Sequence, residues 1–151
     1  MKKIVFHYYG PTNIGRFLIC ARMASVVSHV AIQFEETNYQ ATMLKGVFKE
    51  PSSEMEKGFL AVELSVEDDK YEAAKILCES LVGLNYDFKA IVGFFFSFKL
   101  QGEDNWFCSE LGRVVFEEAT GASIPMLNLM SPGQLRLTIE GYKQGHSIAT
   151  V

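Results

Sequence analysis

The sequence predicts an α+β fold, in which an antiparallel sheet packs against helices within one domain covering residues 1–151. Two observations favour this class. Short segments rich in β-branched and aromatic residues, separated by turn-forming residues, fill much of the chain up to Val66. Segments with helical spacing of apolar residues dominate the remainder. Strands followed by helices are typical of α+β domains, and a chain of this length can bury a core of its own.

The predicted strands follow from their composition and from the residues that bound them. The first ends at Gly10-Pro11, and the second and third are separated by the polar turn 35–38. A later segment alternates between apolar and polar residues. The expected strands are Ile4–Tyr9, Val26–Phe34, Tyr39–Leu44, Gly46–Lys49, Phe59–Val66 and, near the C-terminus, Gln134–Glu140.

The predicted helices begin at side chains that cap helices well, and the one that contains Cys108 ends at Gly121. Asn105 is the expected N-cap of that helix, which places Cys108 in its first turn. The expected helices run from Thr12 or Asn13 to Ala24, from Asp68 or Asp69 to Leu81, from Asp87 to Phe98, and from Phe107 to Thr120.

Composition excludes several classes of function. The net charge is −4 and no Lys/Arg cluster is present, so nucleic acid is not an expected partner. Three widely spaced cysteines give neither a disulfide framework nor a C-x-x-C metal pattern, and no metal or cofactor is expected. The most apolar run, Ala90–Phe98, is far shorter than the roughly 20 residues that span a bilayer. Without a signal-peptide core we expect a soluble protein made in the cytoplasm.

Cys108 is the candidate nucleophile. A thiol attacks a carbonyl only as the thiolate, and a helix N-terminus and a nearby imidazolium both lower the pKa of a thiol. The N–H groups of the same turn are suited to stabilise an oxyanion. Gly112, one turn later, leaves room for another element to approach the sulfur. A buried structural cysteine is the alternative interpretation, and it is the one that we adopt for Cys20 and Cys78.

His29 is the candidate base, because it begins a predicted strand beside small and polar residues. A working imidazole needs a partner for its second ring nitrogen. Gln40 and Thr42 on the next predicted strand share the face of His29. A symmetric turn over residues 35–38 would put Thr42 nearer to His29 than Gln40, so the identity of the third group remains open at this point.

Three segments, in this order, resemble the circularly permuted papain-like superfamily, which includes permuted relatives of the NlpC cell-wall peptidases and, more distantly, the lecithin retinol acyltransferase type. The segments are Ser28-His29-Val30-Ala31-Ile32, then Tyr39-Gln40-Ala41 leading to Gly46-Val47, then Phe107-Cys108-Ser109-Glu110-Leu111. Tyr86-Asp87-Phe88 and Ser131-Pro132-Gly133-Gln134-Leu135 also resemble turns of that family, so that the likeness extends from Ile4 to about Leu137.

The resemblance implies a permuted papain-like fold and a cysteine peptidase or amidase, with Cys108 as nucleophile, His29 as base, Gln40 as the orienting residue and Tyr86 lining the oxyanion site. Gln40 departs from the family pattern, in which an acidic residue is common. The implied substrate is an amide bond of bacterial cell-wall peptidoglycan, which a bacterial or bacteriophage enzyme without an export signal would reach after lysis or from a virion.

Two other functions remain open at this stage. The first is hydrolysis or transfer at a lipid ester or amide, with the phenylalanines of 94–98 lining an acyl groove. The second is a catalytically inactive binding or structural protein on the same fold.

Overall fold

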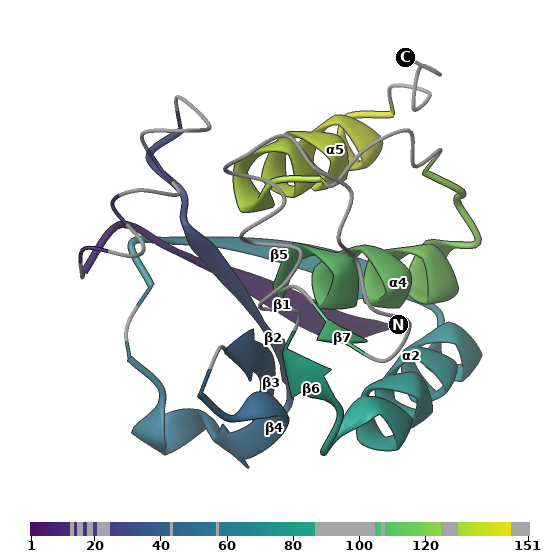
Figure 1. The fold of residues 1–151 in the computed structure, drawn as a ribbon. Coiled ribbons are helices and arrows are strands. Elements are labelled where there is room, and N and C mark those ends of the chain that lie inside the picture. The colour runs from purple at the N-terminus through teal and green to yellow at the C-terminus, as the bar shows by residue number, and fades with distance from the viewer. Residues whose placement is uncertain are drawn as a thin grey trace.

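The computed structural model describes residues 1–12, 14, 17, 20, 25–42, 44–56, 58–86, 105–106, 108–124 and 130–145, with the backbone alone for 85–86 and 105–106. The described chain forms a five-stranded antiparallel sheet, a short parallel strand pair and three α-helices of defined length (Figure 1). The strands are β1 Lys2–Tyr9, β2 His29–Phe34, β3 Thr37–Thr42, β4 Gly46–Pro51, β5 Leu60–Val66, β6 Asn85–Tyr86 and β7 Asn105–Trp106. The helices are α2 Asp68–Leu81, α4 Cys108–Thr120 and α5 Pro132–Lys143, with a 3₁₀ turn η1 at Ser52–Glu54.

The sheet has the strand order β4-β3-β2-β1-β5, and every neighbouring pair is antiparallel. The first strand lies between two partners, so that Phe6 faces Ile32 of β2 on one side and Val62 of β5 on the other. The predicted antiparallel sheet and the five predicted strands up to Val66 are therefore confirmed, with shifts of a few residues at their ends.

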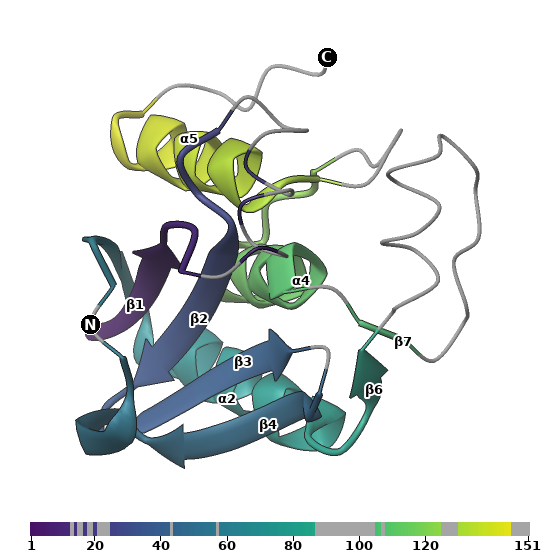
Figure 2. The same ribbon diagram turned by 60° about the vertical axis from the view of Figure 1, so that its left-hand side comes forward.

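One face of the sheet carries the hydrophobic core. Alternate residues of β1 and β2 point to this face, and α2 and α4 pack on it. Figure 2 looks onto the sheet from the other side and shows α2 behind the strands. The ring of Phe34 lies edge-on to Tyr71 of α2, with 5.1 Å between ring centroids. The Tyr39 hydroxyl donates a hydrogen bond to Glu79 of α2, which ties this helix to β3.

The opposite face of the sheet is more polar. Here His7 Nε2 lies 2.7 Å from Gln33 Oε1 of the neighbouring strand. Tyr9 is paired with His29 in the register of β1 with β2, so both side chains belong to this same face. Both are nonetheless buried, at 4% and 5% exposure. This is the face on which the polar groups of the candidate site meet.

Residues 134–140 form part of helix α5, and the predicted strand Gln134–Glu140 is wrong. Polar and apolar residues alternate strictly here, which imitates a strand. A capping box overrides the alternation: Ser131 Oγ accepts from the Gln134 amide and Gln134 Oε1 accepts from the Ser131 amide. Leu135 and Ile139, four residues apart, are fully buried, whereas Leu137 is 60% exposed.

The helix that contains Cys108 begins at Cys108 itself, so the prediction that Asn105 is its N-cap is wrong. Asn105 lies in β7, opposite Asn85 of β6 in a parallel register. Extended backbone up to Trp106 therefore replaces the helical turn that the sequence suggested. The predicted end of the helix at Thr120, before Gly121 with a φ of 71°, is confirmed.

Two other predicted helices fall mainly outside the described residues. Ile14, Phe17 and Cys20 are helical, as expected for the segment up to Ala24, and the rest of that helix is not covered by the description. The predicted helix from Asp87 to Phe98 lies entirely outside it. The predicted helix 68–81 is confirmed as α2.

Gly112 brings α4 close to both α5 and β2. A Cβ atom at this position would lie 2.5 Å from Leu135 Cδ2 and 3.5 Å from Val30 Cγ1. We expect Gly112→Val to lower the free energy of unfolding by about 1–3 kcal/mol through overpacking, measured by urea denaturation followed by circular dichroism.

Gly141 in α5 provides the matched control for this substitution. Nothing lies within 4 Å of a Cβ at Gly141, and its φ is not positive. Gly141→Ala is expected to raise the free energy of unfolding by about 0.5–1 kcal/mol, because alanine restricts the unfolded chain. Equal effects of the two substitutions would contradict the close approach at Gly112.

Candidate active site

Cys108 is the first residue of α4 and is 2% exposed. The N–H groups of a first helical turn have no partner within the helix, and a negative charge there is favoured by the helix dipole. The neighbouring Ser109 donates a hydrogen bond from Oγ to the Met130 carbonyl oxygen at 2.6 Å. This bond fixes the start of α4 against the segment that leads into α5. A thiolate at Cys108 would therefore sit in a rigid and electrostatically favourable position.

The start of α4 lies close to the start of β2. The contact between Gly112 and Val30 locates the helix on the strand. Cys108 is one helical turn before Gly112, and His29 is one residue before Val30. Cys108 and His29 are thus each a few ångströms along their own element from the point where Gly112 of α4 meets Val30 of β2. The side chain of His29 points to the face opposite Val30, so a thiol–imidazole contact would form around the first residue of β2.

The backbone around His29 is held by the end of β1. The Ser28 hydroxyl donates to the carbonyl oxygens of Tyr9 at 3.2 Å and Gly10 at 2.9 Å, and the Ser28 amide donates to Tyr9 O at 2.9 Å. The imidazole packs on the Tyr9 ring, with 5.5 Å between centroids and 46° between ring planes. Two independent restraints, on the backbone and on the ring, therefore orient His29.

A chain of hydrogen bonds leads from His29 to a carboxylate. His29 Nε2 lies 2.9 Å from Gln40 Oε1, and Gln40 Nε2 donates to Glu50 Oε1 at 2.7 Å. Asn38 Nδ2 also lies 3.4 Å from the same carboxylate oxygen. Three strands of the sheet, β2, β3 and β4, each supply one member of the chain His29–Gln40–Glu50.

This chain determines the tautomer of the imidazole. A carboxylate only accepts hydrogen bonds, so the Gln40 amide must turn its NH₂ group toward Glu50 and its carbonyl oxygen toward His29. That oxygen also only accepts, so His29 Nε2 carries a hydrogen. In the neutral ring the lone pair is then on Nδ1. Nδ1 is therefore the ring nitrogen that could act as a base.

The structure selects Gln40 over Thr42 as the partner of His29. The turn between β2 and β3 has two residues, with Glu35 at a φ of 50°, so Phe34 pairs with Thr37 and Gln40 faces Ala31. The four-residue turn expected from the sequence would have placed Gln40 opposite Gln33. The shorter turn moves Gln40 two residues closer to His29. The same register counted onward would put Thr42 opposite His29, so it is the longer side chain of Gln40 that spans the diagonal and reaches the imidazole.

Glu50 is the member of this chain that the sequence analysis missed. It lies on β4 opposite Asn38, because the register of β3 with β4 pairs Gln40 with Phe48. Counting that register through the turn after Thr42 would have placed Glu50 diagonal to Gln40. The acidic group that the resemblance led us to expect at position 40 is therefore present one hydrogen bond further from the imidazole.

Tyr86 is brought near the start of α4 by its backbone. It pairs with Trp106 in the β6–β7 ladder, two residues before Cys108. Backbone hydrogen bonds between Val47 and both Gly83 and Leu84 attach this region to β4. The side chain of Tyr86 lies outside the described residues, as do the phenylalanines of 94–98, so the oxyanion role and the acyl groove both remain predictions.

Cys20 and Cys78 are both buried thiols. Burial raises the pKa of Cys20, an effect that a hydrogen bond with Ser28 partly offsets, and burial raises the pKa of Cys78 far above its usual value. Cys78 lies on the buried side of α2, in its last turn and far from its N-terminus. A protonated thiol is a poor nucleophile, so Cys108, the first residue of its helix, stays the candidate nucleophile.

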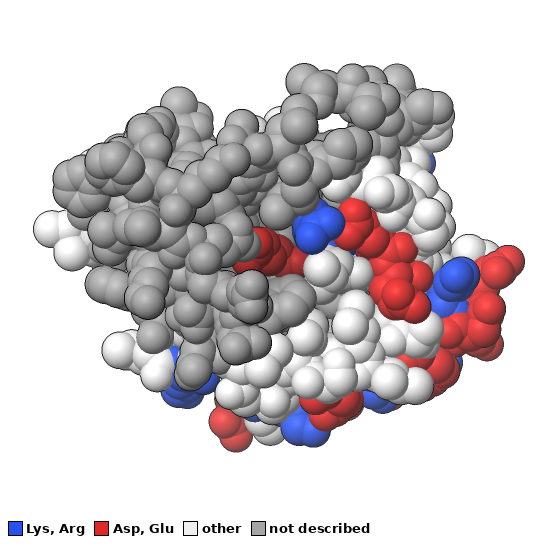
Figure 3. Space-filling view, turned by 45° about the vertical axis from the view of Figure 1, so that its right-hand side comes forward, with Lys and Arg blue, Asp and Glu red and all other residues white. Residues whose placement is uncertain are grey.

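Models of known protein families give no match to this chain, and no curated protein is similar to it in sequence. Among the described residues, no three His, Cys, Asp or Glu side chains are grouped to hold a metal ion, and no helix has the length and apolarity to cross a membrane. On the face drawn in Figure 3, basic side chains of the described residues lie beside acidic ones and form no continuous basic surface.

Proposed function

We propose that this protein is a cysteine hydrolase or acyltransferase. In it, Cys108 attacks a carbonyl carbon, and His29 accepts and donates the protons of the reaction. The observation that carries the proposal is the hydrogen-bonded chain His29–Gln40–Glu50, taken together with a cysteine that begins the helix packed on the His29 strand. A buried structural histidine needs partners for its ring nitrogens, but those partners need not lead to a carboxylate. A chain that fixes the tautomer, orients the ring and ends in a carboxylate is what a catalytic base needs.

The reaction has two steps. The Cys108 thiolate forms a bond to the carbonyl carbon, and the oxyanion that develops accepts hydrogen bonds from N–H groups at the start of α4. The carbon–nitrogen bond then breaks as His29 Nδ1 gives its proton to the leaving amine. Water or another acceptor gives a proton to Nδ1, attacks the thioester and releases the acyl group, which restores the thiolate–imidazolium pair.

The arrangement is the one that a permuted papain-like fold would provide, with the histidine strand before the cysteine helix in the chain. An antiparallel sheet with the cysteine helix packed across it supports that assignment. We therefore propose an amide bond of peptidoglycan peptide as the substrate class. An aliphatic lipid ester or amide is the second candidate, favoured by a mainly apolar cavity lined by Tyr9, whose ring packs on the imidazole.

The function is tested by incubating the purified protein with muropeptides and identifying products by mass spectrometry. We expect cleaved peptides and, after rapid acid quenching, a protein mass increased by one acyl group on a Cys108 peptide. An acyl adduct on another residue, or product formation by Cys108→Ala at the wild-type rate, would contradict the proposal. Turnover of lipid esters with none of muropeptides would transfer it to the second substrate class.

A further inference from the structure

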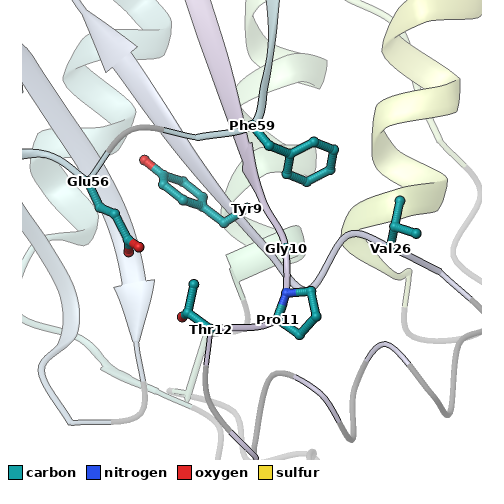
Figure 4. A pocket seen from close by; sticks show the side chains of 7 residues that line it. All are labelled: Tyr9, Gly10, Pro11, Thr12, Val26, Glu56 and Phe59. Atoms are coloured by element: carbon teal, nitrogen blue, oxygen red, sulfur yellow. The ribbon is translucent and has the colours of Figure 1, made fainter.

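A cavity of about 330 Å³ opens at Tyr9 (Figure 4), whose ring also packs on the imidazole of His29. It is lined by the end of β1, by Val26 and by two residues that precede β5, Glu56 and Phe59. Figure 4 shows Phe59, Val26 and Pro11 on one side of the cavity and Thr12 and Glu56 on the other, with Tyr9 between them. Its size lies at the lower end of the range for small-molecule sites.

The cavity is held open by the backbone. Phe59 N donates to Tyr8 O at 3.1 Å, which attaches the β5 wall to the end of β1. Gly58 passes so close to that strand that a Cβ there would lie 2.8 Å from the same Tyr8 oxygen. On the other wall, Ser28 binds the carbonyl oxygens of Tyr9 and Gly10, and Ser25 Oγ accepts from the amide of Val27. The walls are therefore fixed before any ligand arrives.

The surface that the cavity offers is mainly apolar and uncovered. Phe59 and Val26 are 55% and 68% exposed, although both are large apolar side chains. Single exposed apolar residues are common, but two that face a common concave space with Pro11 mark a place for an apolar group. An uncharged aliphatic chain fits this lining.

The position of the cavity indicates which part of a substrate it receives. Tyr9 contributes to its wall and also packs on the imidazole of His29, while none of its lining residues belongs to α4. In the proposed reaction the imidazole gives its proton to the leaving group, whereas the sulfur holds the acyl group. The cavity is thus on the leaving-group side of the bond that breaks.

We propose that this cavity binds an uncharged aliphatic group carried by the leaving group of the substrate, as a specificity site for the reaction of Cys108. The inference rests on the proposed function for its role in turnover, but not for binding itself. An aliphatic amino-acid side chain after the cleaved amide bond and the alkyl chain of a lipid share this chemistry, and the experiment separates the two.

Binding is measured by calorimetry with the Cys108→Ala protein, so that no turnover intervenes. The probes are N-octylacetamide for an alkyl chain and acetyl-glycyl-leucinamide for an amino-acid side chain, with N-methylacetamide and acetyl-glycyl-glycinamide as the short partners. We expect one long probe to bind about tenfold or more tighter than its short partner, in keeping with the discrimination of apolar pockets. The probe that shows the preference identifies the source. Equal affinity of long and short probes in both pairs overturns the inference.

Two substitutions in the same background assign that preference to the cavity. Phe59→Ala removes an exposed wall and is expected to reduce the preference about tenfold. Gly10→Ala places a Cβ at ordinary contact distance, 3.8 Å from Phe59 Cδ1, and so narrows the cavity without a clash. It should weaken the longer probe more than the shorter one. Leu44→Ala, which removes a side chain that is 96% exposed and does not line the cavity, is the control and should change nothing.

The results also separate this inference from the proposed function. A preference that Phe59→Ala leaves intact would place the aliphatic site elsewhere and overturn the inference. One outcome is that the wild-type protein cleaves muropeptides while the cavity substitutions change neither the binding of the probes nor, with Cys108 restored, their turnover. The proposed reaction then stands, and the specificity site is contradicted. If no substrate is turned over while the long probe binds and Phe59→Ala abolishes that binding, the cavity stands and the proposed reaction fails.

Discussion

Replacing Cys108 by alanine is expected to lower kcat on a cleavable substrate by roughly 10³-fold or more, since removal of the attacking group leaves only binding and oxyanion stabilisation. The free energy of unfolding should change much less than the activation free energy of the reaction, because the substitution removes only one atom from a side chain in the core. Initial rates with muropeptides or an activated ester, together with urea denaturation, measure the two effects separately.

Cys78→Ala is the matched control for Cys108→Ala. Both residues are cysteines within helices, and they are 0% and 2% exposed. The loss of a buried sulfur is therefore similar in the two variants, and only a catalytic role separates their activities. Cys78→Ala should retain wild-type kcat. Equal activity of the two variants would make Cys108 a structural cysteine and leave the protein without its proposed nucleophile.

Burial alone does not distinguish the two thiols, so the difference between them must come from their place in the fold. Cys78 lies within α2, where the backbone N–H groups are used by the helix itself, and burial keeps its thiol protonated. Cys108 is the first residue of α4, where N–H groups are available. A small electrophile should therefore label Cys108 before Cys78. His29→Ala should slow that labelling if the imidazole supports the thiolate.

The local pattern of the sequence was sufficient for the sheet and for the faces of its strands. Val30, Ile32 and Phe34 are fully buried in the core cluster, on the face that their alternation predicts, although His29 and Ala31 on the other face of β2 are buried as well. The same rule gave the wrong element at residues 134–140. Their alternation fits a strand, but the capping residues at the N-terminal end of the segment make it a helix. A serine and a glutamine that cap each other outweighed the alternation.

The sequence predicts only those residues of the candidate site whose place does not depend on how neighbouring strands are paired. Cys108 and His29 follow from residue type and from their place at the start of an element. The choice between Gln40 and Thr42 depends on the register of β2 with β3 and on how far each side chain reaches, and the polar sequence of 35–38 resolves neither. Glu50 depends on a second register across β3 and β4. Errors in register accumulate from strand to strand, so the residue furthest from His29 was the one missed.

Replacing Glu50 by glutamine is expected to lower kcat/KM about tenfold, in the range reported for loss of a partner that orients a ligand or base. A glutamine both donates and accepts, so the Gln40 amide would no longer be held with its carbonyl oxygen toward His29 Nε2. Rings with the hydrogen on Nδ1 would then compete, and these have no base facing the reaction. Glu50 is in this sense a positioning residue, since it acts through Gln40.

The pH profile distinguishes positioning from a general loss of structure. Activity requires the imidazolium, so its upper limit in pH is set by loss of that proton. Removing a nearby negative charge disfavours the imidazolium, and the alkaline limb of kcat/KM should therefore move to lower pH in Glu50→Gln. Glu54→Gln changes the net charge equally from an exposed position in η1 and should leave the alkaline limb where it is.

Gln40→Ala, which breaks the chain His29–Gln40–Glu50 at its centre, should lower kcat/KM at least as much as Glu50→Gln. An alkaline limb that does not move in Glu50→Gln would mean that the carboxylate does not act on His29.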